Sequence, residues 1–466
     1  MMEEEGEHTI MLSAECRALQ GAEAARPTTA ETFHLAALPG PMLDVHERQE
    51  LGCVPPPLCG TCKGCDECSR LRLMSKEERT VLERVEKEMK LGPDGKLVAS
   101  YPWTPAAEKM VSNRGQALAV QQKIEARAVA SGQFARLVEA VNVMIEAGTL
   151  RIISREELAT YSGPVHYVTI FPVYKEDSVT TKVRVCTNSA MPNKHSGLSL
   201  NDVMYKGPDL MAGLLRVMIH WRTVEVAVLF DLTKAYWQIK TREKELHLRR
   251  VLWRNSDKED WTTYGITCAT FGDLIAGVLL EVARRRAAVA GTKLGEAIRV
   301  EADLETDADK ANALSNKATH MLETARQVGE SVYVDDGAVG GNRSLVNAMV
   351  GTEGDAEEGL LSQVLDTVGL KAKYTIVSGD PSPEAADKLG DKVLGLQYEL
   401  KDDRIKLTIN IKYKETNRYK ERVEVMLSTQ DILDILNNKR KWTRRNALSF
   451  MMQIFDPLNI LTPVLL

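Results

Sequence analysis

The stretch VEVAVLFDLTKAYWQIKT, residues 224–241, gives the strongest indication of the fold. Positions 226–230 are all apolar, as expected of a strand that is buried on both faces of a sheet. Asp231 follows this run directly. The sequence therefore predicts a central strand that carries a carboxylate at its end.

A second stretch, SVYVDDGAVGG at residues 331–341, predicts a hairpin. We expect a short strand at 331–334, a tight turn at Asp335-Asp336-Gly337 and a return strand at 338–339. Two adjacent acids repel each other unless a cation neutralises them. If the hairpin lies beside the 226–230 strand, the three carboxylates converge and can hold two divalent ions ~3.5–4 Å apart, as nucleotidyl transfer requires. Oxygen ligands favour Mg²⁺ or Mn²⁺ over zinc.

Pairs of aspartates also arise by chance, because 65 of the 466 residues are acidic. Asp402-Asp403 is such a pair, in the charged turn KDDR, where water can screen both charges. The apolar neighbours of YVDD and the separate aspartate at the end of a buried strand favour catalysis over a second solvated turn.

Length and composition limit the number of structural units and the class of protein. A chain of 466 residues exceeds what one core usually organises, so two or more structural units are expected. The net charge of −5 gives no global attraction for nucleic acid or membrane, so a polyanion site has to be a local patch. The start, MMEEEGEH, is acidic where a secretory signal is basic, and no run of ~18 apolar residues exists. We expect an intracellular, cytoplasmic protein without a membrane segment.

The remaining pattern is irregular and predicts an α+β fold. Ser75 and Glu78 form a capping box for a helix that Gly92-Pro93 ends, and a longer helical region runs to Gly148. The other expected elements are a hairpin of 165–170 and 183–185 around a polar loop at 175–182, helices at 242–252 and 274–290, a solvated acidic insertion at 301–316, and strands at 393–400 and 405–411.

Clustered cysteines predict a metal site. Cys59, Cys62, Cys65 and Cys68 are each separated by two residues, and Cys53 lies just before them. In a reducing compartment such thiols are metal ligands more often than disulfides, and zinc is the expected ion. The spacing is tight for one zinc and partly fits an iron–sulfur run, although the last gap is two residues rather than three. An unliganded loop is the alternative, since three prolines flank the cluster.

FDLTKAYWQIKT at 230–241, YVDDG at 333–337 and the cysteine run together resemble the pol region of BEL/Pao-type LTR retrotransposons. The likeness covers residues 53–466 and continues, in order, in GPVHYVTIFPVYKEDSVTTKVRVCTNSA (163–190), GLSLNDVMYKGP (197–208), LRRVLWR (248–254), VLGLQYEL (393–400) and IFDPLNILTPV (454–464). The resemblance implies a reverse transcriptase with the right-hand polymerase fold: fingers, a palm with an antiparallel sheet, and the start of a thumb.

The resemblance also implies roles for single residues. Asp231, Asp335 and Asp336 match the palm carboxylates that bind the catalytic Mg²⁺ or Mn²⁺. Tyr236 matches the residue under the incoming sugar that excludes a 2′-hydroxyl, with plain core packing as the alternative. Further matches are Lys175 and Arg184 on the triphosphate, Gly272 where the backbone lies close to nucleotide and template, Lys371 or Lys373 as proton donor to pyrophosphate, 394–398 as primer grip, and the basic tail at 412–445 as thumb.

This chain departs from the family pattern in several places. Asn188 stands where many relatives have Asp, and the residues after Gly272 read DLIAG without the usual proline, which puts the nucleotide pocket in doubt. An aspartic protease triad is absent, and the sequence stops before a complete RNase H or integrase. We therefore expect a polyprotein fragment or the product of a decayed element.

The expected organisation is a poorly ordered leader at 1–52, a cysteine-rich metal-binding loop at 53–70, a helical linker at 71–160, fingers and palm at 161–400 and a basic segment at 401–466. The expected activity is RNA-directed DNA polymerisation, with RNA template, DNA primer, dNTPs and other polyprotein segments as partners, in cytoplasmic retroelement particles. One alternative is a relic that binds nucleic acid without polymerising. The other is that the cysteine cluster acts by itself as a knuckle that binds nucleic acid.

Overall fold

The computed structural model describes residues 9–11, 74–174, 182–351, 358–380, 392–394, 396–400, 402–408, 412–416, 422–426, 429–437 and 439. The predicted metal-binding loop at 53–70 and Lys175 lie outside these residues, as does all of the predicted leader except Thr9–Met11. The structure combines helices with several small β-sheets, so the prediction of an α+β fold is confirmed. Within the described part of the chain, every helix is too short or too polar to span a bilayer.

The central element is a four-stranded antiparallel sheet in the order β11-β12-β7-β13. Its strands are β7 (Val226–Leu232), β11 (Val332–Tyr333), β12 (Asp336–Gly341) and β13 (Ala372–Val377). The strand predicted at 226–230 and the YVDD hairpin are therefore neighbours, as the sequence led us to expect. The turn between β11 and β12 differs from the prediction, because it consists of Val334 and Asp335, and Asp336 already belongs to the return strand.

Both faces of β7 are buried, which explains its unbroken apolar sequence. Val228 and Phe230 point into a core shared with three helices, α8 (Ala276–Leu304), α10 (Arg343–Val350) and α11 (Leu360–Asp366). Ala227 and Leu229 point to the opposite face, into a core formed with α7 (Leu214–Thr223) and β15 (Leu396–Glu399). The sheet is the middle layer between these two cores.

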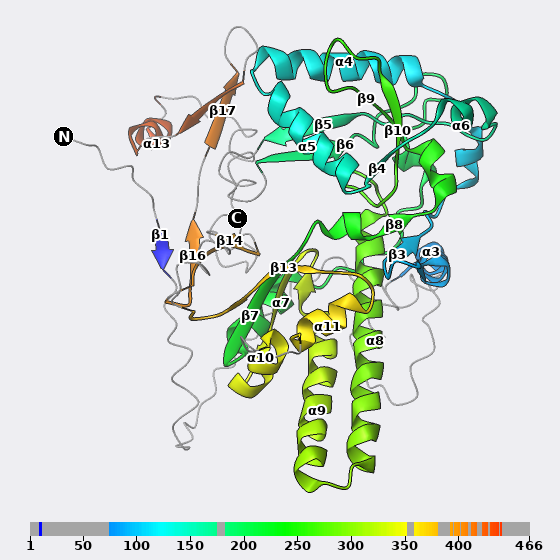
Figure 1. The fold of residues 1–466 in the computed structure, drawn as a ribbon. Helices are drawn as coiled ribbons and strands as arrows, with labels where there is room; N and C mark the ends of the chain where they lie inside the picture. The colour runs from blue at the N-terminus through cyan, green and yellow to red at the C-terminus, as the bar shows by residue number, and fades with distance from the viewer. Residues whose placement is uncertain are drawn as a thin grey trace, which may run out of the picture.

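The insertion predicted at 301–316 is the end of a long helical hairpin. Helix α8 continues to Leu304, and α9 (Ala308–Glu330) returns beside it (Figure 1). Asp307 begins α9 as its N-cap, since its carboxylate accepts from the amides of Asp309 and Lys310. The prediction of a solvated segment is correct for most side chains at this end, and the alanines favour helix there.

A second group of elements precedes the central sheet. The predicted helix after Ser75 is α3 (Lys76–Glu88), and both hydrogen bonds of its capping box are present. The helical region predicted up to Gly148 contains α4 (Arg114–Ala130) and α5 (Phe134–Glu146). The predicted linker at 71–160 is not wholly helical, since it also contains β2 (Lys90–Leu91), β3 (Leu97–Ala99), η2 (Pro105–Lys109), β4 (Leu150–Ile152) and α6 (Arg155–Thr160).

A hairpin is present as predicted, formed by β5 (Ile170–Tyr174) and β6 (Val183–Thr187). Its first strand was predicted at 165–170 and lies later in the chain, sharing only Ile170 with the prediction. The helix predicted at 242–252 is wrong. This segment forms a 3-10 helix, η5 (Glu243–Leu248), and then the fully buried strand β9 (Arg250–Trp253). Strand β9 pairs with β10 (Thr262–Ile266), and burial of all four of its residues favours the sheet over a helix with one polar face.

The described elements of the C-terminal part include a second small sheet, in which Thr9–Met11 (β1) pairs with β16 (Arg404–Thr408). The leader therefore has regular structure at these three residues, in contrast to the prediction. The remaining elements are η3 (Asn201–Val203), η4 (Ala235–Gln238), β8 (Lys240–Thr241), β14 (Lys392–Val393), β17 (Lys412–Thr416), β18 (Arg422–Met426) and α13 (Thr429–Leu436).

Candidate active site

Three of the predicted site residues meet at the end of the central sheet. Asp231 on β7 is the direct cross-strand partner of Asp336 on β12. Asp335, in the β11–β12 turn, accepts a hydrogen bond from the Leu232 amide through its backbone carbonyl, at 2.9 Å. Asp231, Asp335 and Asp336 therefore lie together because the register of two strands and one tight turn places them there.

The backbone of this turn is strained. Val334 adopts a φ of 59°, in the left-handed region that β-branched residues rarely enter. Such a conformation costs on the order of 1–3 kcal/mol and persists only where surrounding contacts hold it. Lys234, three residues after Asp231, has a φ of 44°. Strained residues thus flank the carboxylates on both chain segments.

The electrostatics of the site show a shortage of positive charge. Burial, followed by the charges of Asp335 and Asp231, raises the pKa of Asp336 to about 7. Burial and then Asp335 raise the pKa of Asp231 to about 6, and burial raises the pKa of Asp335 as well. A carboxyl group with a raised pKa resists ionisation until a cation approaches it.

Two basic side chains partly offset this repulsion. Lys373 on β13 places its Nζ 3.7 Å from Oδ2 of Asp231. Arg184, exposed on β6, lowers the pKa of all three carboxyl groups. Of the two lysines that the sequence left open, Lys373 is the one that pairs with the site, whereas the backbone carbonyl of Lys371 accepts a hydrogen bond from Thr233.

The donor set fits a hard divalent cation bound jointly with a substrate. Among the residues that the structure describes, no three His, Cys, Asp or Glu side chains are placed as ligands of a single ion. Mg²⁺ does not need such a cage, because it keeps waters and is held by one or two carboxylates together with substrate phosphates. Closely spaced, undercompensated carboxylates of this kind are the expected protein share of that coordination.

Tyr236 and Phe271 form an aromatic pair beside the carboxylates. Tyr236 lies in η4, and its ring is 4.7 Å from that of Phe271 at an interplanar angle of 81°. Burial and the charge of Asp335 raise the Tyr236 pKa. Tyr236 packs partly against the main core, whereas Phe271 is 43% exposed. The two interpretations of Tyr236, core packing and a platform for the sugar, are therefore compatible.

The backbone conformation at position 272 requires a glycine. Its φ is 108°, and a Cβ at this position would lie 2.3 Å from the carbonyl oxygen of Thr187 at the end of β6. The sequence predicts a glycine that approaches nucleotide and template. The structure gives a local reason for glycine here, namely the approach of the 271–272 loop to β6.

Two residues near the site escaped the sequence analysis. Tyr374 is the cross-strand partner of Asp231 on its other side, and burial followed by the three carboxylates raises its pKa well above the usual value. Asp273 is buried next to Gly272. In sequence, Tyr374 lies in an ordinary strand pattern and Asp273 resembles any loop acid, so neither gives a distinguishing signal.

The segment predicted as a primer grip also reaches the site. A hydrogen bond with the Leu394 backbone lowers the pKa of Asp336, and Leu394 has a φ of 51° in the turn between β14 and β15. Most side chains of the predicted basic tail at 412–445 lie outside the described residues, so its phosphate contacts stay a prediction.

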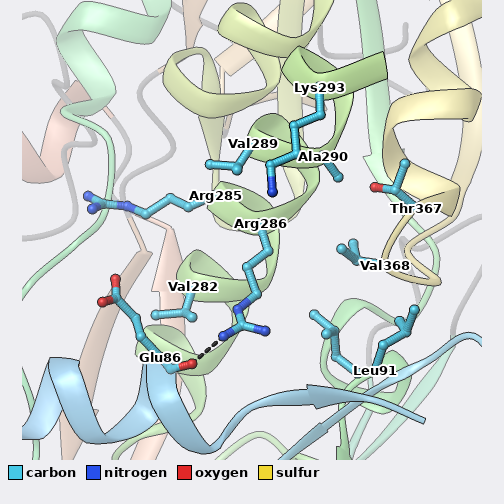
Figure 2. A pocket seen from close by; sticks show the side chains of 11 residues that line it. Glu86, Leu91, Val282, Arg285, Arg286, Val289, Ala290, Lys293, Thr367 and Val368 are labelled. Atoms are coloured by element: carbon cyan, nitrogen blue, oxygen red, sulfur yellow. Dashed lines mark hydrogen bonds between the residues drawn. The ribbon is translucent and has the colours of Figure 1, made fainter. Parts of the chain in front are cut away.

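A separate groove of about 530 Å³ lies along α8 and is lined by none of the predicted site residues. Figure 2 shows Lys293 and Arg286 projecting into it from α8, with Val368 on the far side. Arg286 donates a hydrogen bond to the backbone carbonyl of Glu86 on α3.

Comparisons with known proteins give limited information. No protein family and no curated protein matches this sequence. Among solved structures, a foamy viral protease-reverse transcriptase in complex with double-stranded DNA matches with 14% identity and a TM-score of 0.30. The match covers 69% of this chain and 41% of the viral one. Likeness at this level is too weak to assign a fold or a function.

Proposed function

We propose that this chain is a nucleotidyltransferase that acts by two-metal catalysis. The observation that carries the proposal is the register that sets Asp231 opposite Asp336 with Asp335 beside them. Carboxylates that raise one another's pKa at a sheet end are costly unless a ligand uses them. Mg²⁺ or Mn²⁺ held there would activate a hydroxyl nucleophile and neutralise the charge of a leaving pyrophosphate.

The neighbouring side chains support a nucleoside triphosphate as substrate. Arg184 on β6 is close enough to lower the pKa of the carboxyl groups, and we propose that it contacts phosphate oxygens, which a guanidinium binds well. Tyr236 and Phe271 offer an aromatic surface for the sugar. Lys373, next to Asp231, would supply a proton to pyrophosphate in this proposal. The predicted role of Lys175 on the triphosphate belongs to the same proposal.

The sequence resemblance specifies the reaction further. We propose an RNA-directed DNA polymerase of the BEL/Pao type, which takes an RNA template, a DNA primer and dNTPs and works in cytoplasmic particles with other polyprotein segments. The motif strings FDLTKAYWQIKT and YVDDG support this specific form. The primer 3′-hydroxyl would attack the α-phosphate of the dNTP, forming a new phosphodiester and releasing pyrophosphate.

The test is primer extension by the full chain on an RNA template with Mg²⁺. We expect Asp336→Asn to lower the rate by at least about a thousandfold, since it removes a metal ligand. Asp402→Asn is the matched control, because Asp402 belongs to the other Asp-Asp pair and is exposed. Extension that persists in Asp336→Asn would refute the assignment. Template binding without extension by the wild type would favour the alternative of an inactive, nucleic-acid-binding relic.

The cysteine cluster leads to a separate proposal, a structural zinc site formed by Cys59, Cys62, Cys65 and Cys68. The support is their regular spacing alone. The full chain expressed in zinc-supplemented medium should contain about one zinc per chain. Replacement of Cys62 and Cys65 by Ser should remove it, whereas replacement of the buried Cys268 should not. A metal-free, folded wild type would disprove the site.

A further inference from the structure

The loop that carries Phe271 and Gly272 is fixed by contacts to two other segments. The carbonyl of Phe271 accepts from the Thr187 amide at 3.2 Å and from the Thr187 hydroxyl at 2.6 Å. Asn201 donates to the Gly272 carbonyl and accepts from the Leu274 amide, both at 3.0 Å. These contacts hold the loop while Phe271 stays 43% exposed beside Tyr236.

The next residue, Asp273, is the most completely satisfied carboxylate near the site. Its Oδ1 accepts from Ser189 Oγ at 2.6 Å. Its Oδ2 accepts from Arg249 at 2.6 Å, from Tyr101 Oη at 2.7 Å and from Thr270 Oγ1 at 3.0 Å. The four donors come from four separate positions in the chain, and together they fix the orientation of the carboxylate in three dimensions.

Arg249, the charged partner, is equally enclosed. The side chains of Arg249 and Asp273 are 0% and 1% exposed. The guanidinium also donates to the Cys268 carbonyl at 2.7 Å and lies over the Tyr101 ring, 4.6 Å from its centroid. Residues on both sides of the Phe271-Gly272 loop are thus tied to one buried ion pair.

Stability alone does not account for this pair. An ion pair removed from water loses so much hydration free energy that apolar residues of similar volume are often as stabilising or more so. Its hydrogen bonds, in contrast, fix direction, which an apolar contact does not. A precise loop position matters when an adjacent exposed side chain contacts a ligand.

We propose that Asp273 and Arg249 are positioning residues that orient the Phe271-Gly272 loop, and with it the ring of Phe271, for the sugar and base of the incoming nucleotide. The identity of that ligand rests on the proposed polymerase function. The fixing of the loop does not, so the two can be tested separately.

The first experiment is hydrogen exchange on the full chain. Asp273→Asn keeps the volume of the side chain and removes its charge. We expect amides of residues 270–276 to exchange at least about tenfold faster in this variant, because the loop opens locally. The matched control is Glu245→Gln. Glu245 is also buried and accepts from Ser100 Oγ, the Tyr101 amide and Trp103 Nε1. It is connected to Asp273 only indirectly, because the hydroxyl of the same Tyr101 donates to Asp273.

The second experiment is steady-state primer extension under conditions where each variant is folded. Asp273→Asn should raise the KM for dNTP about tenfold with a smaller change in kcat, while Glu245→Gln should change neither more than about twofold. Asp273→Glu, which keeps the charge, should recover part of the affinity. A merely structural role would affect thermal stability in both variants and leave the KM of both unchanged.

If Asp273→Asn does not fold, Ser189→Ala removes a single donor and should give the same changes on a smaller scale. Equal exchange at residues 270–276 in the Asp273 and Glu245 variants, or no acceleration in either, would overturn the proposal. A wild type without extension would overturn the polymerase function alone, and the exchange data would still decide whether this pair fixes the loop.

Discussion

Asp273 and Asp336 are both largely removed from solvent, but their surroundings differ completely. Asp273 accepts four hydrogen bonds and faces the guanidinium of Arg249. Asp336 faces the carboxylate of Asp231 across the sheet and that of Asp335 in the turn. One site satisfies a single negative charge completely, and the other assembles three negative charges with too few cations.

The comparison separates acids that hold parts of the chain in position from acids that are available to bind a ligand. A carboxylate that serves the fold is surrounded by donors, because an unpaired buried charge is strongly destabilising. A carboxylate that serves a ligand is left short of partners, and the protein tolerates the resulting strain and raised pKa. The strained φ of Val334 in the turn of the acid site agrees with the second case.

Breaking the satisfied site should have the largest effect on folding. Arg249→Met leaves Asp273 charged, buried and without its cation, and we expect the free energy of unfolding to fall by about 3–5 kcal/mol. Urea denaturation at pH 7 measures this change. The double variant Arg249→Met/Asp273→Leu replaces both partners with apolar groups and should recover most of the loss. A double variant as unstable as the single one would show that packing, not charge, holds this region.

The loop between the two sites should show an intermediate effect. In Gly272→Ala, the new Cβ would collide with the Thr187 carbonyl at a φ of 108°. We expect a loss of roughly 2–3 kcal/mol, since the loop has to move away from β6. Gly277→Ala is the control, because nothing lies within 4 Å of a Cβ at that position on α8. Similar stability of the two variants would mean that the loop is not tightly held.

Neutralising a carboxylate of the Asp231–Asp335–Asp336 site should stabilise the fold, in contrast to breaking the Arg249–Asp273 pair. Asp336 has a pKa of about 7 in the folded chain against about 4 when unfolded, so the folded state binds the extra proton. Stability is therefore greatest at low pH and is lost as the pH rises from about 4 to about 7. Asp336→Asn, which imitates the protonated form, should be more stable than wild type by roughly 2 kcal/mol at pH 8 and equal to it near pH 4.

Thermal melts across this pH range, with and without Mg²⁺, distinguish the protonated from the ionised form of Asp336. Mg²⁺ should stabilise the wild type at pH 8 by binding the ionised carboxylates of the folded state, and should have little effect on Asp336→Asn. An Asp336→Asn variant that is less stable than wild type at pH 8 would place Asp336, like Asp273, among the acids that hold the chain in position.

The sequence predicted the Asp231–Asp335–Asp336 site but not the Arg249–Asp273 pair. The apolar run before Asp231 and the YVDD hairpin are local patterns, and the repulsion between adjacent acids predicted a cation site on the condition that the two strands are neighbours. The Arg249–Asp273 pair has no such pattern, because in sequence both residues resemble solvated charges. Burial of the pair depends on Tyr101, which contacts both members, and on Ser189, which donates to Asp273, and the tertiary fold brings these residues near.

The same limit explains the error at 242–252. The apolar residues Leu248, Val251 and Leu252 have the i, i+3, i+4 spacing of one helix face, which fits a helix with one polar face if the arginines of this segment are solvated. In the structure Arg249 and Arg250 are buried, and Arg250 donates to His247 at 2.7 Å. Polar side chains with partners inside the fold thus break the link between polarity and exposure on which periodicity depends. The turn at Val334-Asp335 was misplaced for a related reason, since propensity disfavours a valine at positive φ.

Lys373 provides the smallest and most specific test of the comparison. Its ammonium group, 3.7 Å from Asp231, lowers the pKa of that carboxyl group, which burial and Asp335 raise to about 6. Lys373→Met should therefore raise the Asp231 pKa further. The pH range over which the fold loses stability should extend to higher pH as a result. Near pH 4, the free energy of unfolding should change by less than about 1 kcal/mol. NMR titration of the aspartate carboxyl carbons measures the shift directly. Lys371→Met is the control, because the Lys371 backbone carbonyl accepts a hydrogen bond from the Thr233 amide while its side chain is exposed. An equal shift in both variants, or none in either, would mean that the carboxylates are balanced by other charges, and the site would then resemble the one at Asp273.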